Sequence, residues 1–190
     1  MEKDWTTQQV ETMPVIALRG LTIFPNVLIH FDVAREISIK ALEEAMTAGS
    51  PVFLVGQKDL AVEKPEAKDL YTVGTVSKVR QILRMPGDNV RVMVEGLCRG
   101  SLDELKRTSP YLEAVVRTIP AEKAGNNSAK TEALIRSTYE MFQQYTELAP
   151  KTAPDLLINV LASEDPGYIA DFIAQNIAMR NSDKQAVLEE

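Results

Sequence analysis

His30 is the single histidine and Cys98 the single cysteine of this sequence, and both residue types take part in nucleophilic or acid–base catalysis. A histidine titrates near neutral pH and can act as a general base, and a cysteine thiolate is a nucleophile. His30 lies in an alternating apolar and polar run, which favours an ordinary strand position. Cys98 has no histidine near it in the sequence, which favours a buried structural thiol. An autonomous hydrolase therefore requires the fold to bring His30 and Cys98 together.

The sequence contains no other motif that carries chemistry. The phosphate-binding patterns GxxxxGK[ST] and GxGxxG are absent, and so is the nucleophile elbow GxSxG. One cysteine and one histidine do not make a zinc site with the usual ligands. We expect no catalytic residue, no metal and no cofactor, and hence no enzymatic activity of this chain by itself.

A basic cluster raises the possibility of nucleic-acid binding. Lys78, Arg80, Arg84 and Arg91 fall in one predicted hairpin, and a small barrel can bind nucleic acid. The formal net charge of the chain is −6, however, and the hairpin has no aromatic residue on which bases could stack. A solvated strand face is the better interpretation, and nucleic-acid binding is unlikely on these grounds.

The composition predicts one large or two small folded domains. Of the 190 residues 45% are hydrophobic and 25% are charged, which is enough for a sizeable core. A single cysteine excludes an internal disulfide and is typical of a reducing compartment. The first residues are polar and acidic, unlike a signal peptide, and no apolar run approaches the roughly 20 residues that span a bilayer. We expect a soluble, cytoplasmic protein without a membrane partner.

The chain changes character near residue 120. Before it, β-branched runs are separated by Gly and Pro; after it, helical periodicity prevails. The predicted strands are 14–19, 27–33, 52–57, 72–85, 90–96, 97–105 and 111–119, and a helix at 35–49 ends at Gly49. Several antiparallel strands with one inserted helix predict a closed or half-closed barrel over residues 1–120.

The most informative part of this region is the predicted hairpin at 72–96. If "PGDN" (86–89) is its loop, the opposed pairs are Met85 with Val90, Arg84 with Arg91, Leu83 with Val92, Ile82 with Met93 and Arg80 with Glu95. The apolar face is then Val79, Leu83, Met85, Val90, Val92 and Val94. Opposed like charges are unfavourable, so Arg84 and Arg91 must be solvated or bound to acidic groups.

Residues 121–190 are predicted to form a helical subdomain. An amphipathic pattern ends at Pro150, "TAPD" (152–155) resembles a capping box, and Asp165-Pro166 is a strong start signal. A last helix begins at Ser182. It is only two turns long when the sequence stops, which suggests a longer parent protein.

Several blocks of the sequence resemble a known family, the N-terminal domain of Lon, the ATP-dependent protease of bacteria and organelles. The blocks are "LRG…FP", "LYTVGTVSKV", "VEGLCR" and "DKQAVLEE", in this order. The resemblance covers essentially all of residues 13–190. One departure is Ile37 in "AREIS", where family members commonly have a lysine, and any charge that this block contributes to substrate handling is weaker here.

The resemblance implies an α+β fold: an antiparallel β-barrel similar to the pseudouridine-synthase-associated (PUA) RNA-binding type, with one inserted helix, followed by a C-terminal helical bundle. It implies a non-catalytic domain that recognises unfolded or damaged protein segments and assists assembly. Its partners are then those substrates, the rest of a Lon chain with its ATPase and Ser-Lys protease modules, and sister subunits of a homo-oligomer. The alternative is a free-standing barrel that binds a ligand or nucleic acid.

The segment "TIFP" (22–25) raises a specific question about the binding site. It is either a device that turns the chain between two strands or part of an exposed apolar patch. The patch hypothesis combines Phe24, Pro25, Val27, Leu83, Met85 and Pro86. Exposed apolar surface suits a receptor for unfolded protein, and the flexible methionine side chain accommodates varied partners.

Overall fold

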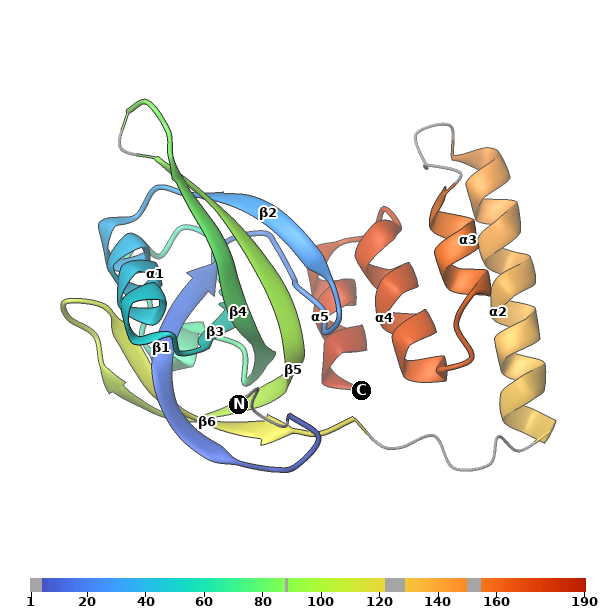
Figure 1. The fold of residues 1–190 in the computed structure, drawn as a ribbon, viewed down its shortest axis with the longest axis horizontal. Coiled ribbons are helices and arrows are strands. Elements are labelled where there is room, and N and C mark those ends of the chain that lie inside the picture. The colour runs from blue at the N-terminus through green and yellow to red at the C-terminus, as the bar shows by residue number, and fades with distance from the viewer. Residues whose placement is uncertain (1–4, 88, 122–128, 150–154) are drawn as a thin grey trace. The chain divides into compact units, whose positions relative to one another are not determined.

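The computed structural model describes residues 5–87, 89–121, 129–149 and 155–190 (Figure 1). The chain divides into two compact units. One comprises Met1–Ala121 together with Arg180–Glu190, and the other comprises Glu122–Met179. Among the described residues, no helix is long and apolar enough to cross a membrane.

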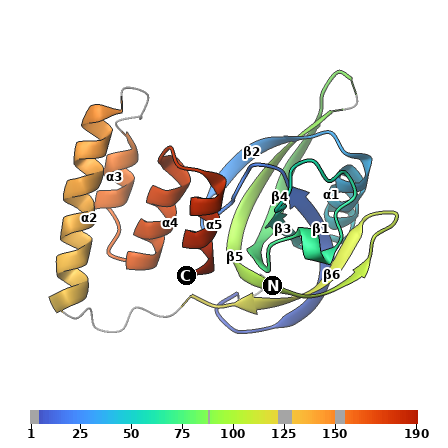
Figure 2. The same cartoon turned by 180° about the vertical axis from the view of Figure 1, so that it is seen from behind.

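The first unit is a β-barrel. Its elements are β1 (Val10–Leu18), β2 (Leu28–Val33), α1 (Glu36–Ala48), β3 (Val52–Gly56), η1 (Ala67–Asp69), β4 (Val73–Arg84), β5 (Val90–Arg107), β6 (Leu112–Ile119) and α5 (Asn181–Glu189). The strand order is β2-β5-β4-β3-β1-β6, and β5 also pairs with β6, which closes the sheet (Figures 1 and 2). The long strand β5 pairs with β2 along its first part and with β6 along its second.

The α+β class and the β-barrel with one inserted helix are confirmed, with one difference in strand direction. β1 and β3 run parallel, with Val15 opposite Phe53, so the barrel is not wholly antiparallel. Parallel neighbours require a crossover connection, and here β2 and α1 lie between the two strands in the sequence. The sequence pattern of two short apolar runs does not reveal their relative direction.

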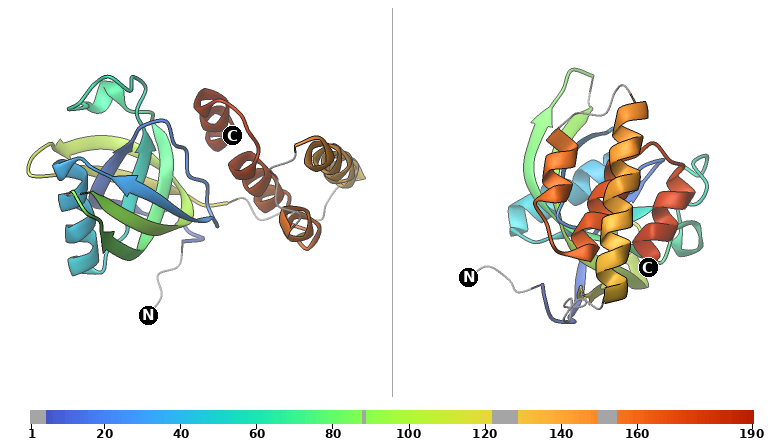
Figure 3. Two further views of the ribbon diagram at one scale, coloured as in Figure 1. Left: turned by 90° about the horizontal axis from the view of Figure 1, so that it is seen from above. Right: turned by 90° about the vertical axis from the view of Figure 1, so that its right-hand side faces the viewer.

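The inserted helix α1 closes part of the barrel core, and Figure 3 shows it in light blue along one side of the barrel. Ala41, Leu42 and Ala45 are buried against the barrel interior. The helix ends where expected, at Gly49, whose φ of 61° places it in the left-handed conformation that glycine adopts without strain. At the other end, the Arg35 guanidinium donates to the carbonyl of Ala17 and anchors the helix start to β1.

The second unit contains α2 (Ala129–Leu148), α3 (Asp155–Leu161) and α4 (Pro166–Asn176). These helices share a small core around Phe142, Val160 and Ile169. The predicted start at Asp165-Pro166 is present: the Asp165 carboxylate accepts from the backbone N–H of Gly167 at 2.9 Å. The expected cap at Thr152 lies outside the described residues. The structure does not confirm a helical bundle spanning residues 121–190, because the last helix belongs to the first unit.

The last helix, α5, packs on the barrel. Gln185 is buried and its amide donates to the Val73 carbonyl at 3.0 Å, and Arg99 donates to the Leu188 carbonyl at 2.9 Å. The structure therefore groups residues 180–190 with the β-rich unit, whereas the expected division placed them in the helical one. The contacts that decide this join residues about 90 to 110 positions apart, which helical periodicity does not reveal.

Candidate functional site

The β4–β5 hairpin extends beyond the rest of the barrel (Figure 1). Its tip contains the apolar residues Leu83, Met85 and Pro86. The Met85 N–H donates to the Asn89 carbonyl at 2.8 Å and closes the tip, where Gly87 takes a φ of 82°. Leu83 and Met85 keep 45% and 40% of their surface exposed, and Pro86 is also exposed. Large apolar side chains at a projecting tip are accessible to a partner.

The register of this hairpin differs by one residue from the predicted one. Near the tip Arg84 pairs with Val90 and Leu83 with Arg91, and a bulge between Val79 and Gln81 inserts Arg80 as an extra residue. A shift of one residue turns side chains to the opposite face of a strand. The prediction that Leu83 shares an apolar face with Val92 is therefore wrong. Leu83 and Met85 are both exposed, as the patch hypothesis expects.

The expected clash between Arg84 and Arg91 is resolved by the same shift. The Arg84 guanidinium donates to Glu43 of α1 at 2.6 Å, and Arg91 forms a two-point pair with Asp32 of β2 at 2.7 and 3.0 Å. Each arginine thus meets an acidic group of the same chain, on a different side of the hairpin.

The turn containing Phe24 and Pro25 is sealed against the barrel, so the expectation that these two residues stay partly exposed is wrong. Phe24 has 0% of its surface exposed and Pro25 is buried; Val27 is half-buried. The turn packs on β5 at Gly96, where a Cβ would lie 2.3 Å from the Phe24 carbonyl oxygen. The Asn26 N–H donates to the Gly96 carbonyl, and the Gly96 N–H donates to the Val27 carbonyl, both at 2.9 Å.

The structure therefore separates the six residues of the patch hypothesis into two groups. Leu83, Met85 and Pro86 are together at the hairpin tip. The other group, which lies beside Gly96, consists of Phe24, Pro25 and Val27. Gly96 is six residues along β5 from Val90, or roughly 20 Å at strand spacing. The segment 22–25 is a device that turns the chain, and the exposed apolar side chains lie elsewhere.

A continuous outer face runs over β2, β5 and β4 below the tip. We use the term outer face for the outward side chains Leu28, His30, Asp32, Gln81, Leu83, Arg91, Met93 and Glu95, which occupy opposed positions in the register. Leu28 is 58% exposed and Met93 is half-buried. Asn26, Leu28, Arg80, Met93 and Glu95 line a shallow hollow of about 460 Å³ there.

Sequence reasoning did not assign Leu28 and Met93 to the site. The signal for Leu28 was present, because the alternation in residues 27–33 predicts that it shares a face with His30 and Asp32, and the exposure pattern confirms this alternation. Met93 was expected on the mixed face of the hairpin, opposite Ile82. The structure places it between His30 and Gln81, so it joins Leu28 on the outer face.

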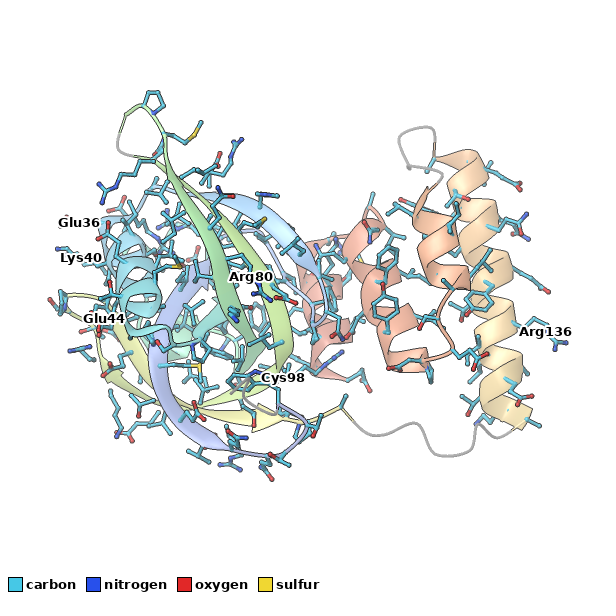
Figure 4. The ribbon with its side chains drawn as sticks, viewed as in Figure 1. Glu36, Lys40, Glu44, Arg80, Cys98 and Arg136 are labelled. Carbon is cyan, nitrogen blue, oxygen red and sulfur yellow. The ribbon has the colours of Figure 1, made fainter. Side chains whose placement is uncertain are left out.

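The three arginines around the outer face are paired within the chain, whereas Lys78 is exposed opposite Glu95. Arg80, labelled in Figure 4, donates to Glu95 at 2.6 Å, in addition to the Arg91–Asp32 pair. The hydrogen bond from Arg91 lowers the pKa of Asp32 below its ordinary value of 3.8. The surface presented to a partner is consequently apolar with its arginine charges neutralised, which is a poor match for a phosphate backbone.

The two potentially catalytic residues lie apart. His30 is exposed on the outer face opposite Met93, whereas Cys98 is buried five residues further along β5 and faces the core. Figure 4 shows Cys98 toward the end of the barrel away from the hairpin tip. Burial raises the pKa of the Cys98 thiol to about 12, so its reactive thiolate is suppressed. Among the described residues, no group of His, Cys, Asp or Glu is arranged to hold a metal ion.

Comparison with known proteins decides the family. A profile described as the ATP-dependent protease La (LON) substrate-binding domain matches residues 12–190. The chain belongs to this family. It is 38% identical over 181 residues to a Lon protease of Desulforamulus reducens and 39% identical over 193 residues to one of Clostridioides difficile.

These alignments cover 95% and 100% of this chain, but only 22% and 24% of the two Lon proteases. The chain thus spans less than a quarter of the length of these two relatives, and the family match identifies it with the substrate-binding domain.

Two solved structures support the fold. The N-terminal domain of Mycobacterium avium complex Lon protease matches with a TM-score of 0.73 at 17% identity, covering 95% of this chain and 90% of that one. The Lon N-terminal domain protein from Xanthomonas campestris matches with a TM-score of 0.66 at 11% identity and the same coverage. At such low identities the likeness extends to the fold of the Lon N-terminal domain and not to individual side chains.

Proposed function

We propose that this chain recruits unfolded or damaged protein segments to a Lon-type ATP-dependent protease. Membership of the Lon substrate-binding domain family supplies the general role. Under this proposal the remaining three quarters of a Lon chain contain the ATPase and protease modules, and sister subunits of a cytoplasmic homo-oligomer present several such domains together.

The observation that carries the proposal is the apolar surface at the hairpin. Leu83 and Met85 at the tip and Leu28 on the outer face are large, apolar and well exposed. A folded protein buries side chains of this kind, whereas an unfolded segment exposes its own and gains free energy when the two surfaces meet. The methionine side chain repacks against different sequences, which suits a receptor for many substrates.

Binding by one domain is expected to be weak. A flexible segment loses conformational freedom when it is held, and this loss offsets much of the gain from a small apolar contact. Weak single contacts are compatible with capture by an oligomer, because linked domains increase the effective concentration of the substrate. They also allow release of the segment for degradation.

The free-standing nucleic-acid-binding barrel is not favoured. Arg80, Arg84 and Arg91 each pair with a carboxylate of the same chain, and the hairpin contains no aromatic residue for stacking. Phosphates would have to displace three intramolecular ion pairs, while the chain as a whole repels a polyanion.

The proposal is tested by titrating the chain with an acidic protein in its unfolded and native forms, for which reduced, carboxymethylated α-lactalbumin and native α-lactalbumin are suitable. The unfolded form is expected to bind and the native form is not. Replacement of Leu83 and Met85 by serine is expected to weaken binding about tenfold, which corresponds to the loss of about 1.4 kcal/mol of apolar contact.

A matched control is available in the same unit. Leu60 and Met46 are 53% and 44% exposed, similar to Leu83 and Met85, but lie outside the outer face. The Leu60→Ser/Met46→Ser variant is expected to bind like the original chain. An equal loss of affinity for unfolded α-lactalbumin in both double variants would contradict the proposal. Equal affinity for the native and the unfolded forms would also contradict it.

A further inference from the structure

Strand β2 lies at an edge of the sheet. It pairs with β5 over Leu28–Val33, and within the part of the chain that the structure describes no strand pairs with its other edge. An edge strand presents backbone N–H and C=O groups that a further strand can satisfy.

The direction of the backbone groups follows from the first contact between β2 and β5. The Val27 carbonyl accepts from Gly96 and so points toward β5. Because backbone groups alternate in direction along an antiparallel strand, those of Ile29 and Phe31 also point toward β5. The N–H and C=O groups of Leu28, His30 and Asp32 then point away from β5, along the open edge.

The burial pattern shows that this edge is uncovered. Ile29 and Phe31 face the barrel core yet are only half-buried, whereas their partners Val94 and Val92 on β5 are 0% exposed. The core is therefore open to solvent on the β2 side.

The edge also lacks the usual protection against pairing. Proteins block exposed edges with lysine, proline or unpaired charges. β2 contains neither lysine nor proline, and its one acidic residue, Asp32, is paired with Arg91. The edge of β4 near the tip differs, because Arg84 connects it to Glu43 of α1.

We propose that the β2 edge binds an extended segment of unfolded polypeptide as an added strand. This inference rests on the proposed function and specifies how the substrate is held. Six residues of β2 offer roughly 20 Å of edge, the length of an ordinary strand. The added strand forms backbone hydrogen bonds, which do not depend on its sequence, while every second side chain lies next to Leu28 on the outer face.

This mode of binding explains selection for unfolded protein in a second way. The backbone groups of a native protein are already paired in its own helices and sheets, so they are not free to join β2. An unfolded segment offers free backbone groups and free apolar side chains together. The preferred substrate is therefore an extended segment with an apolar residue at every second position.

Hydrogen exchange of the unmodified 190-residue chain, followed by NMR, tests the proposal. Saturation with reduced, carboxymethylated α-lactalbumin is expected to slow exchange of the Leu28, His30 and Asp32 amides about tenfold. The Ile29 and Phe31 amides, already bonded to β5, are expected to change little. Absence of added protection at the first three amides under saturating substrate would overturn the added strand.

A pair of substitutions at His30 isolates the backbone contribution. His30→Pro and His30→Thr both remove the imidazole, but only proline removes the N–H that points to the open edge. Affinity for the unfolded protein is expected to be about five- to tenfold lower for the proline variant than for the threonine variant. Retained exchange protection at Ile29 and Phe31 shows that the proline variant still pairs with β5. Equal affinity of the two folded variants contradicts the proposal.

The outcomes separate this inference from the proposed function. If no unfolded protein binds, the proposed function fails. If unfolded protein binds but the edge amides stay unprotected, only the added strand fails. Protection of these amides in the free chain that increases with its concentration, together with dimers in sedimentation, identifies a second copy as the occupant and also overturns the proposal.

Discussion

Phe24-Pro25 and Met85-Pro86 each combine a large apolar residue with a following proline, and the two segments lie in opposite environments. Phe24-Pro25 is buried beside β5, whereas Met85-Pro86 is exposed at the tip of the β4–β5 hairpin. The residue types are similar, so the difference comes from what lies opposite each segment. Gly96 leaves room for the backbone of the first, while the second extends beyond the barrel.

The contrast teaches that an apolar residue near a turn is not by itself a sign of a binding surface. The Phe24 turn forms main-chain hydrogen bonds through Asn26 and Val27, and the Phe24 side chain is fully buried. The tip has only the closing bond between Met85 and Asn89 within the described residues. Stability and binding are therefore expected to depend on different segments.

The largest expected effect is on stability. Phe24→Ala removes a side chain that is fully buried and is expected to lower the free energy of unfolding by about 4 kcal/mol. Met85→Ala, at an exposed position, is expected to change it by less than about 0.5 kcal/mol. Urea unfolding followed by circular dichroism measures the free energy of unfolding of both variants. A similar decrease for Phe24→Ala and Met85→Ala would contradict the distinction between the two segments.

The next effect concerns the glycine that lets the Phe24 turn approach. Gly96→Ala places a Cβ 2.3 Å from the Phe24 carbonyl oxygen, so the turn must move. We expect this change to lower the free energy of unfolding by about 2 kcal/mol. Gly49→Ala is a useful comparison, because a Cβ there has no other atom within 4 Å and only the positive φ is unfavourable. We expect it to lower the free energy of unfolding by about 1 kcal/mol. A Gly96 variant as stable as the original chain would show that the turn is not sealed by close approach.

The smallest expected effect is on the ion pair between Asp32 and Arg91, which lies next to the exposed hairpin. Arg91 lowers the pKa of Asp32, so their pairing contributes stability above the ordinary value of 3.8, and this contribution is lost as the pH falls through the lower folded-state value. Arg91→Gln is expected to raise the pKa of Asp32 toward 3.8 in an NMR titration of the carboxylate. An unchanged pKa would mean that the ion pair does not form in solution.

Much of the fold follows from local patterns. The alternation of Leu28–Val33, the end of α1 at Gly49 and the start of α4 at Asp165 each depend on residues within one element, and each is present in the structure. The hairpin itself also follows from its turn sequence. These features are predictable because local physical chemistry determines them.

The features that were not predicted depend on distant residues. The bulge at Arg80 shifts the register of the tip, the parallel pairing of β1 and β3 depends on the crossover, and α5 packs on the barrel through Gln185 and Val73. The burial of Phe24 depends on Gly96, which is 72 positions away in the sequence. For the site, the exposed group Leu83, Met85 and Pro86 came from the sequence, and its continuation over Leu28 and Met93 required the structure.

The central claim is that the exposed hairpin and outer face, and not the buried turn, contact unfolded protein. An NMR titration of the whole chain with reduced, carboxymethylated and native α-lactalbumin tests it most directly. The account predicts that only the unfolded form shifts signals, and that the shifts occur at Leu28, Leu83, Met85 and Met93 but not at Phe24. Shifts confined to residues 129–176, or equal shifts with the native form, would contradict it.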